Sequence, residues 1–187
     1  MRSRYYACQG LTLIELLTLL AILSILLSAA IPGTNKLVEN GQGSAEVNSI
    51  LGFFALARQE AVMSGKVVTM CPLKRDGRCG RDWNSDVSMF HDPQNQRSIS
   101  ANTIILRVLP STSYGTRKVR SLSRSYFQFR PNGMMYSDLG NITWCPPSNS
   151  ATSAAHIIIS KGGRVRVAKD QNGDGIVERA NGTAVDC

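Results

Sequence analysis

Gly10-Leu11-Thr12-Leu13-Ile14-Glu15-Leu16 opens an apolar run that ends at Ile31-Pro32. From Leu11 to Ile31 the run has 21 residues, and Glu15 is the only one of them that carries a charge. A helix needs about 20 apolar residues to span the hydrocarbon core of a bilayer. We therefore predict a membrane-spanning helix over residues 11–32, in which a carboxylate near the start requires a partner or a function.

The ten residues before this run are polar, and they include Arg2 and Arg4 but no acid. Basic residues that flank a membrane span stay in the cytoplasm, which places everything after Pro32 across the membrane. A secretory signal peptide is the alternative, but it would have a shorter apolar region and a clear small-x-small cleavage site. Ser28-Ala29-Ala30 matches such a site only weakly, so the sequence favours an anchored protein.

The stretch from Gly10 to Glu15, together with Pro32, resembles the start of type IV pilins and type II secretion pseudopilins. Leu11 departs from that pattern, because the family usually has Phe there. The resemblance implies that residues 1–10 are a leader, which a prepilin peptidase cuts between Gly10 and Leu11 before it methylates Leu11. It also implies that Glu15 neutralises the amino terminus of a neighbouring subunit.

The implied route starts in the inner membrane, with the N-terminus in the cytoplasm and the head in the periplasm. The head then becomes extracellular when the chain joins a pilus with other major and minor pilins.

After Pro32, apolar residues from Val47 to Val62 recur every three or four positions, as in a helix with one buried face. We expect the second half of the helix over residues 33–63, with a loosened turn at Gly41 and Gly43. Strand-like runs follow at 66–71, 103–109, 126–129, 134–136, 141–145, 156–160 and 164–167. The predicted fold class is α+β, with the long helix packed on a head of antiparallel sheets over residues 64–187.

The chain has five cysteines, of which Cys8 belongs to the leader. The other four predict two disulfides in an oxidising compartment, for which three pairings are possible. We favour Cys71–Cys79, which closes a charged loop, and Cys145–Cys187, which ties down the C-terminus. Zinc is the competing hypothesis, but no cysteine pair has the close spacing of a structural zinc site.

The net charge of +8 comes from one block of the head. Residues 33–96 carry seven basic and seven acidic side chains, whereas residues 97–169 carry eleven basic side chains and one acid, Asp138. Such a block predicts an acidic partner or a polyanion.

Gly163-Arg164-Val165-Arg166 is the strongest functional motif in the head. On a strand, residues two apart face the same side, so Arg164 and Arg166 would project together. Two guanidinium groups on one face, with Lys161 and Lys169 nearby, suit the phosphates of a nucleic acid. The alternative is the solvated face of an edge strand, where charge discourages aggregation.

The stretches 56–62, 67–71 and 129–133 resemble the GspH/FimT group of minor pilins, although Asp86 stands where that group commonly has Gly. The motif at 163–166 is similar to the GRxR motif of DNA-uptake minor pilins in this group. That resemblance implies sequence-independent DNA binding through Arg164, Arg166, Lys161, Lys169 and Arg130, in natural transformation. Two alternatives remain: a minor pilin that primes pilus assembly with other pilins, and a minor pseudopilin of type II secretion.

Asp170, Asn172 and Asp174 have the alternating oxygen ligands of half a calcium loop. The twelfth position is Asn181 rather than the bidentate Glu of an EF-hand, so we favour a turn rich in Asp, Asn and Gly over a metal site. His91 and His156 are isolated in the sequence, and no catalytic motif accompanies them. We therefore predict no enzymatic activity and no cofactor.

Overall fold

The computed structural model describes residues 12–121 and 124–187, without the side chains of residues 29–33 and 35. Helix α1 runs from Leu13 to Ser64, close to the limits of the two predicted halves, residues 11–32 and 33–63. The chain forms two compact units, residues 1–38 and 39–187, which we describe separately. The predicted cleavage between Gly10 and Leu11 lies outside the described residues.

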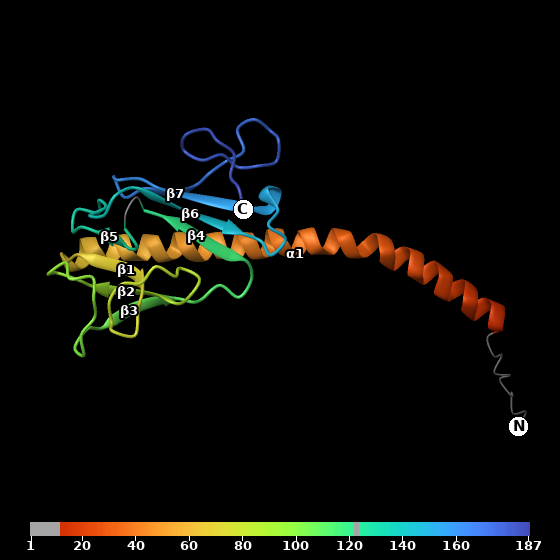
Figure 1. Ribbon diagram of the computed structural model, residues 1–187, viewed down its shortest axis with the longest axis horizontal. Helices are drawn as coiled ribbons and strands as arrows, with labels where there is room; N and C mark the ends of the chain where they lie inside the picture. Colours follow the sequence, from red (N-terminus) through yellow and green to blue (C-terminus); the bar gives the residue numbers. More distant parts are fainter. Residues whose placement is uncertain (1–11, 122–123) are drawn as a thin grey trace, which may run out of the picture. The chain divides into compact units, whose positions relative to one another are not determined.

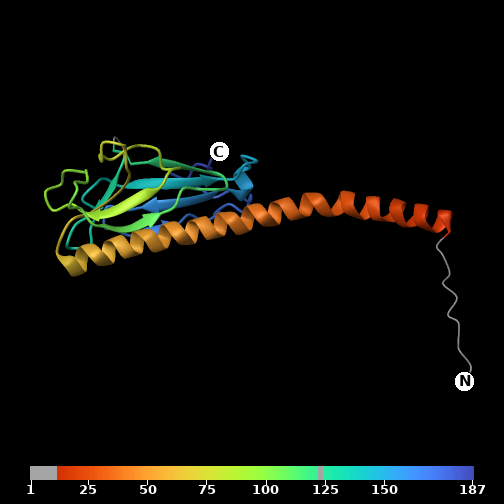
Figure 2. The ribbon, with the colours of Figure 1, turned by 90° about the horizontal axis from the view of Figure 1, so that it is seen from below.

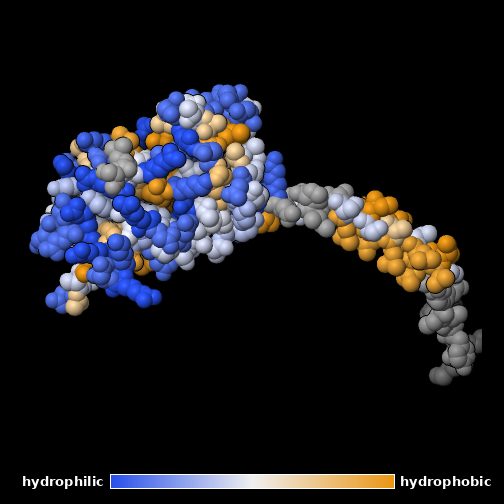
Figure 3. Space-filling view, viewed as in Figure 1, coloured by the Kyte–Doolittle hydropathy of each residue, from blue (hydrophilic) through white to orange (hydrophobic). Residues whose placement is uncertain are grey.

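The first unit presents apolar side chains to its surroundings. Eleven large apolar residues of α1 between Leu13 and Leu27 are 49% to 78% exposed, and they form much of the orange surface in Figure 3. An apolar surface of this extent on one chain indicates an element that other molecules cover. None of the described helices combines the length and apolarity needed to cross a membrane.

The second unit contains two four-stranded sheets in which every strand pair is antiparallel (Figure 1). The first sheet has the order β3-β2-β1-β5, with β1 Val68–Pro72, β2 Val87–His91, β3 Ile105–Leu109 and β5 Phe127–Phe129. The second has the order β4-β6-β7-β8, with β4 Thr116–Arg120, β6 Gly140–Cys145, β7 Ala155–Ile159 and β8 Val165–Val167. A short 3₁₀ turn, Ala151–Ser153, precedes β7.

The second half of α1 packs along both sheets (Figure 2). Its buried positions follow the predicted spacing of three or four residues and include Val47, Ile50, Phe54 and Ala57. The Phe54 ring meets Phe127 edge-to-face, with centroids 5.3 Å apart. This packing of one helix face against antiparallel sheets is the predicted α+β architecture.

Three expectations differ from the structure. Residues 134–136 do not form a strand, because the Met135 N–H donates to the carbonyl of Lys161 in the β7–β8 turn, which leaves only a single bridge to Phe129. The helix is also continuous at Gly43. Because Gly43 has no side chain, the Trp144 ring can pack against the helix at this position. A Cβ on Gly43 would lie 2.7 Å from Cζ3 of Trp144. Strands β2 and β4 were not predicted.

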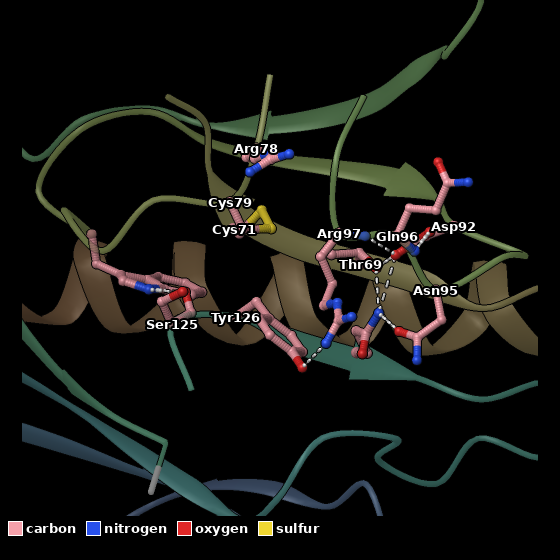
Figure 4. The surroundings of a disulfide bond; sticks show 12 residues. Thr69, Cys71, Arg78, Cys79, Asp92, Asn95, Gln96, Arg97, Ser125 and Tyr126 are labelled. Atoms are coloured by element: carbon pink, nitrogen blue, oxygen red, sulfur yellow. Dashed lines mark hydrogen bonds between the residues drawn. A yellow bond between two sulfur atoms is a disulfide. The ribbon is translucent and has the colours of Figure 1, made fainter. Parts of the chain in front are cut away.

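Both expected disulfides are present, Cys71–Cys79 and Cys145–Cys187. Figure 4 shows the first of them, with the buried carboxylate of Asp92, which holds the loop after β2, to its right. Asp92 accepts hydrogen bonds from the Thr69 hydroxyl at 2.9 Å and from the backbone N–H groups of Gln96 and Arg97 at 2.7 and 2.9 Å. These bonds fix the loop after β2 to β1.

Candidate nucleic-acid interface

The turn that carries the arginine motif is fixed by close backbone packing. Gly163 has a φ of 79°, and a Cβ at this position would lie 2.2 Å from the carbonyl oxygen of Gly133. Any other residue would push the β7–β8 turn away from the turn after β5. The glycine of the motif therefore has a structural role, which is to set where β8 and its arginines begin.

Arg164 and Arg166 lie on the outer face of the second sheet, which points away from the core. Val165, between them, packs against the hydrophobic core, and alternation along the strand turns its two neighbours outward. Both arginines are exposed. Within residues 12–121 and 124–187, neither side chain has an ion pair or a hydrogen bond, so both guanidinium groups are available to a ligand.

A third arginine, Arg120, shares this outer face at the opposite edge of the sheet. Arg120 of β4 pairs with Asn141 of β6. Asn141 pairs in turn with Ile158 of β7, and Ile158 pairs with Arg166 of β8. Directly paired residues point to the same face, so these four form one row across the sheet, which we call the open row.

The adjacent row on the same face is covered. It consists of Lys118, Thr143 and His156, which pair across β4, β6 and β7. Thr143 and His156 are only 6% and 1% exposed, although they point outward. We call this the covered row, and the C-terminal tail, residues 170–187, lies beside it (Figure 1). Cys187 ties the tail down through its disulfide to Cys145 and through its carbonyl oxygen, which accepts a hydrogen bond from Lys118 Nζ.

His156 is the buried titratable group of the covered row. Its Nδ1 lies 2.8 Å from the Thr143 hydroxyl. Burial, followed by the positive charges of Arg179, Arg120 and Arg166, lowers the pKa of His156 to about 4.

The other residues predicted to bind DNA are exposed, but they do not all join Arg164 and Arg166. Lys161 lies in the β7–β8 turn, next to the turn that begins at Arg130. The Arg130 guanidinium stacks over the Tyr136 ring, 4.5 Å from its centroid. Lys169 lies beyond β8, after Ala168, whose N–H donates to the His156 carbonyl oxygen. Lys161 and Arg130 can therefore extend the arginine face, whereas Lys169 is at the start of the tail.

Several basic residues of the block are structural. Arg117 is 4% exposed, and its side chain bonds to Glu46 of α1 and to the carbonyl oxygens of Trp83 and Pro110. Arg124 donates to the Tyr126 hydroxyl at 2.7 Å and to Asp138 at 3.2 Å. The Tyr126 hydroxyl, and then Asp138, raise the pKa of Arg124. Counting charges in the sequence could not separate these residues from the free arginines.

The predicted calcium ligands lie in a tightly hydrogen-bonded loop. Asp170 accepts bonds from the N–H groups of Gly175 and Gly173, which lower its pKa, and Asn172 Oδ1 accepts from the Asp174 N–H. The ligand atoms of Asp170, Asp174 and Glu178 lie within 4.8 Å of one another. Glu178, rather than Asn172, completes this group, but it already accepts a bond from the Gln171 N–H. These bonds explain the acids as turn-forming residues.

Glu15 lies in the first turn of α1. Its carboxylate accepts from the Thr12 N–H at 3.4 Å, and the Thr12 hydroxyl accepts from the Glu15 N–H at 3.3 Å. This reciprocal arrangement is a capping box, which satisfies two free donors at the helix start. In the single chain, Glu15 thus stabilises its own helix. Its pairing with a neighbouring amino terminus stays a prediction.

The sequence profile of the family described as type II transport protein GspH matches residues 46–163, more than half of the chain. The chain belongs to the GspH family. The matched segment ends at Gly163, so membership alone assigns no role to Arg164 or Arg166. A comparison with curated proteins found none that matches.

One protein of known structure shows the same fold. The type IV minor pilin FimU of Pseudomonas aeruginosa (strain PAO1), in two crystal forms, gives TM-scores of 0.53 and 0.51 at 18% sequence identity. The alignments cover 70% and 67% of this chain and 91% and 92% of FimU. The minor pseudopilin EpsH of the Vibrio cholerae type II secretion system gives 0.48 at 10% identity, over 67% of this chain and 95% of EpsH.

The GspH family comprises minor pilins and pseudopilins of type IV pili and type II secretion systems, and this protein is one of them. Its role is structural and non-enzymatic, and family membership implies assembly with other pilins.

Proposed function

We propose that this GspH-family protein is a minor type IV pilin that binds extracellular DNA for uptake in natural transformation. The observation that carries the proposal is the pair of exposed guanidinium groups at Arg164 and Arg166, which have no acidic partner among the described residues. Guanidinium groups bind phosphate oxygens in bidentate geometry. Contacts to phosphates carry no base information, so the expected binding is independent of sequence.

The N-terminal segment supports the other part of the proposal, which is that the chain assembles into a pilus. A prepilin peptidase cleaves between Gly10 and Leu11, and the chain waits in the inner membrane with its head in the periplasm. Pilus assembly then carries the head outside the cell. The exposed apolar side chains from Leu13 to Leu27 would pack against other pilins, and Glu15 would neutralise the amino terminus of a neighbour.

The DNA contact is tested by titrating fluorescent duplex DNA of random sequence with the full chain in a neutral detergent, over a series of salt concentrations. Each lost phosphate contact lowers the slope of log K against log salt by about 0.9. We expect Arg164→Ala with Arg166→Ala to reduce the slope by about 2 and the affinity by on the order of 50-fold at 0.1 M salt.

The matched control is Arg75→Ala with Arg107→Ala, which removes the same charge from exposed positions away from the second sheet. Full DNA affinity and an unchanged salt slope in the Arg164/Arg166 variant would refute the assignment. In cells, lost transformation with normal piliation supports DNA binding. Lost piliation would instead favour a pilin that primes assembly and docks an acidic neighbour through this face.

A further inference from the structure

A cavity of about 660 Å³ opens at the edge of the head where β4 ends and β6 begins. Three arginines line it, Arg81, Arg120 and Arg124, together with the polar side chains of Ser121, Ser125 and Asn141. No acidic residue lines it among the described residues. A concave surface with three positive charges and several hydrogen-bond donors is suited to an oxyanion.

Two of the three guanidinium groups lack a partner. Arg124 is held by Tyr126 and Asp138, as described above. Arg81 and Arg120 make no ion pair and no side-chain hydrogen bond within residues 12–121 and 124–187. The cavity therefore contains one preoriented arginine and two that are free to close on a ligand.

The Ser121 hydroxyl provides an independent observation at the same place. Ser121 is 2% exposed, and its Oγ is buried without a hydrogen-bond partner among the described residues. Leaving a buried hydroxyl unpaired costs free energy, so buried polar groups are nearly always bonded in native proteins. Ser121 also lines the cavity, and rotation of its side chain would let an anion bound there accept this hydrogen bond. No part of the site is built on residues 122 and 123, which lie outside the described residues.

The cavity is continuous with the open row. Arg120 lines the cavity and also forms one end of that row, whose other end is Arg166. Three strand spacings separate these two residues, roughly 14 Å. Only Asn141 and Ile158 lie between them, and both are partly exposed and uncharged. A polyanion on Arg164 and Arg166 would therefore meet no opposing charge from these two residues between β8 and the cavity.

We propose that this cavity binds one phosphate group of the DNA held by Arg164 and Arg166, so that the DNA crosses the second sheet from β8 to β4. Arg81, Arg120 and Arg124 bind the phosphate oxygens, and the Ser121 hydroxyl donates a hydrogen bond to one of them. The inference rests on the proposed function and adds a second anchor to it. An acidic protein in the same cavity is the alternative that the test must exclude.

The test compares Arg81→Gln with Arg120→Gln against the control pair Arg75→Gln with Arg107→Gln, in the full chain with duplex DNA. We expect the cavity pair to lower the salt slope by about 1 and the affinity about 10-fold at 0.1 M salt, because one phosphate contact is lost. The control pair should change neither the salt slope nor the DNA affinity. Ser121→Ala should weaken DNA binding about 3-fold without loss of thermal stability, since it removes an unpaired hydroxyl.

A second measurement uses inorganic phosphate alone. Titration of the ¹⁵N-labelled chain should shift the amide signals of Ser121, Arg124 and Asn141, and the shifts should vanish in the cavity pair. If Arg164 and Arg166 matter for DNA and the cavity pair does not, the inference fails while the proposed function stands. If phosphate shifts these signals but DNA does not bind at all, both fail. Equal losses of DNA affinity in the cavity pair and in the control pair would mean that net charge alone causes the effect. That result would also overturn the inference.

Discussion

Two neighbouring rows on the outer face of the second sheet have opposite surroundings. The open row, from Arg120 to Arg166, is solvent-accessible at both ends, and its arginines have no partner among the described residues. In the covered row, Thr143 and His156 are buried. Strand geometry treats the two rows alike, and we attribute the difference to the C-terminal tail, which is tied down beside the covered row.

The tail also differs in charge from the surface it adjoins. Residues 170–187 contain four acids and one arginine, Arg179, and this arginine forms an ion pair with Asp186. An acidic segment fixed beside a basic row limits where a polyanion can bind, because like charges repel. The surface that is open to a polyanion is therefore set by the tail as much as by the arginines.

Releasing the tail is the change with the largest expected effect. The Cys145–Cys187 disulfide joins residues 42 apart, and the loop-closure relation assigns it about 4 kcal/mol. We expect Cys145→Ala with Cys187→Ala to lower the free energy of unfolding by about this amount and to expose the covered row to hydrogen exchange. Guanidinium denaturation of the full chain in neutral detergent measures the loss, and the fluorescence of Trp83 and Trp144, both in the head, reports it.

The control for this prediction is the other disulfide. Cys71 and Cys79 are 8 residues apart, for which the same relation gives about 2.5 kcal/mol. Their replacement by Ala should leave hydrogen exchange of the covered row unchanged. Equal exposure of that row in both variants would contradict the role assigned to the tail.

The inner and outer arginines of β4 provide the second prediction. Arg117 points inward to Glu46, whose side chain is 15% exposed, and removal of one partner of a buried ion pair is costly. We expect Arg117→Met to lower the free energy of unfolding by about 3 kcal/mol, with no change in the salt slope of DNA binding. Arg120→Met, three residues along the strand, should do the opposite: a stability change within about 0.5 kcal/mol and a smaller salt slope. The same denaturation and DNA titrations measure both, and a shared phenotype would refute the separation of the two faces.

This contrast explains which strands could be predicted from the sequence. Alternating or β-branched runs identified β1, β3, β5, β6, β7 and β8, and the hairpin of β7 and β8 is as expected. The sequence of β4, Thr-Arg-Lys-Val-Arg, has a charged residue at an inward position. Its partner, Glu46, is 71 residues away, so no local pattern indicates that Arg117 is buried. In β2, four of five residues are buried, which removes the alternation that would mark a strand.

The candidate site, too, could be predicted from the sequence only in part. Arg164 and Arg166 could be predicted to share a face, because a spacing of two residues is local information. Their alignment with Arg120 depends on the register of four strands, and the buried Ser121 hydroxyl depends on how the chain turns after β4. The cluster of Arg81, Arg120 and Arg124 at the cavity could therefore be found only from the folded chain.

The smallest expected effect concerns pH and the covered row. Because the pKa of His156 falls from its ordinary value of 6.5 to about 4 on folding, the imidazole is neutral in the folded protein between these values and protonated in the unfolded chain. The unfolded state then binds more protons, so stability is full above pH 6.5 and is lost as the pH falls towards 4. Between pH 7 and pH 5 this loss amounts to about 2 kcal/mol. Urea denaturation at several pH values should show the decline in the native chain and a flatter profile in His156→Gln, which keeps a polar group near Thr143 but cannot titrate. Parallel profiles would mean that His156 is solvated in the native protein, and that the tail does not exclude water from this row.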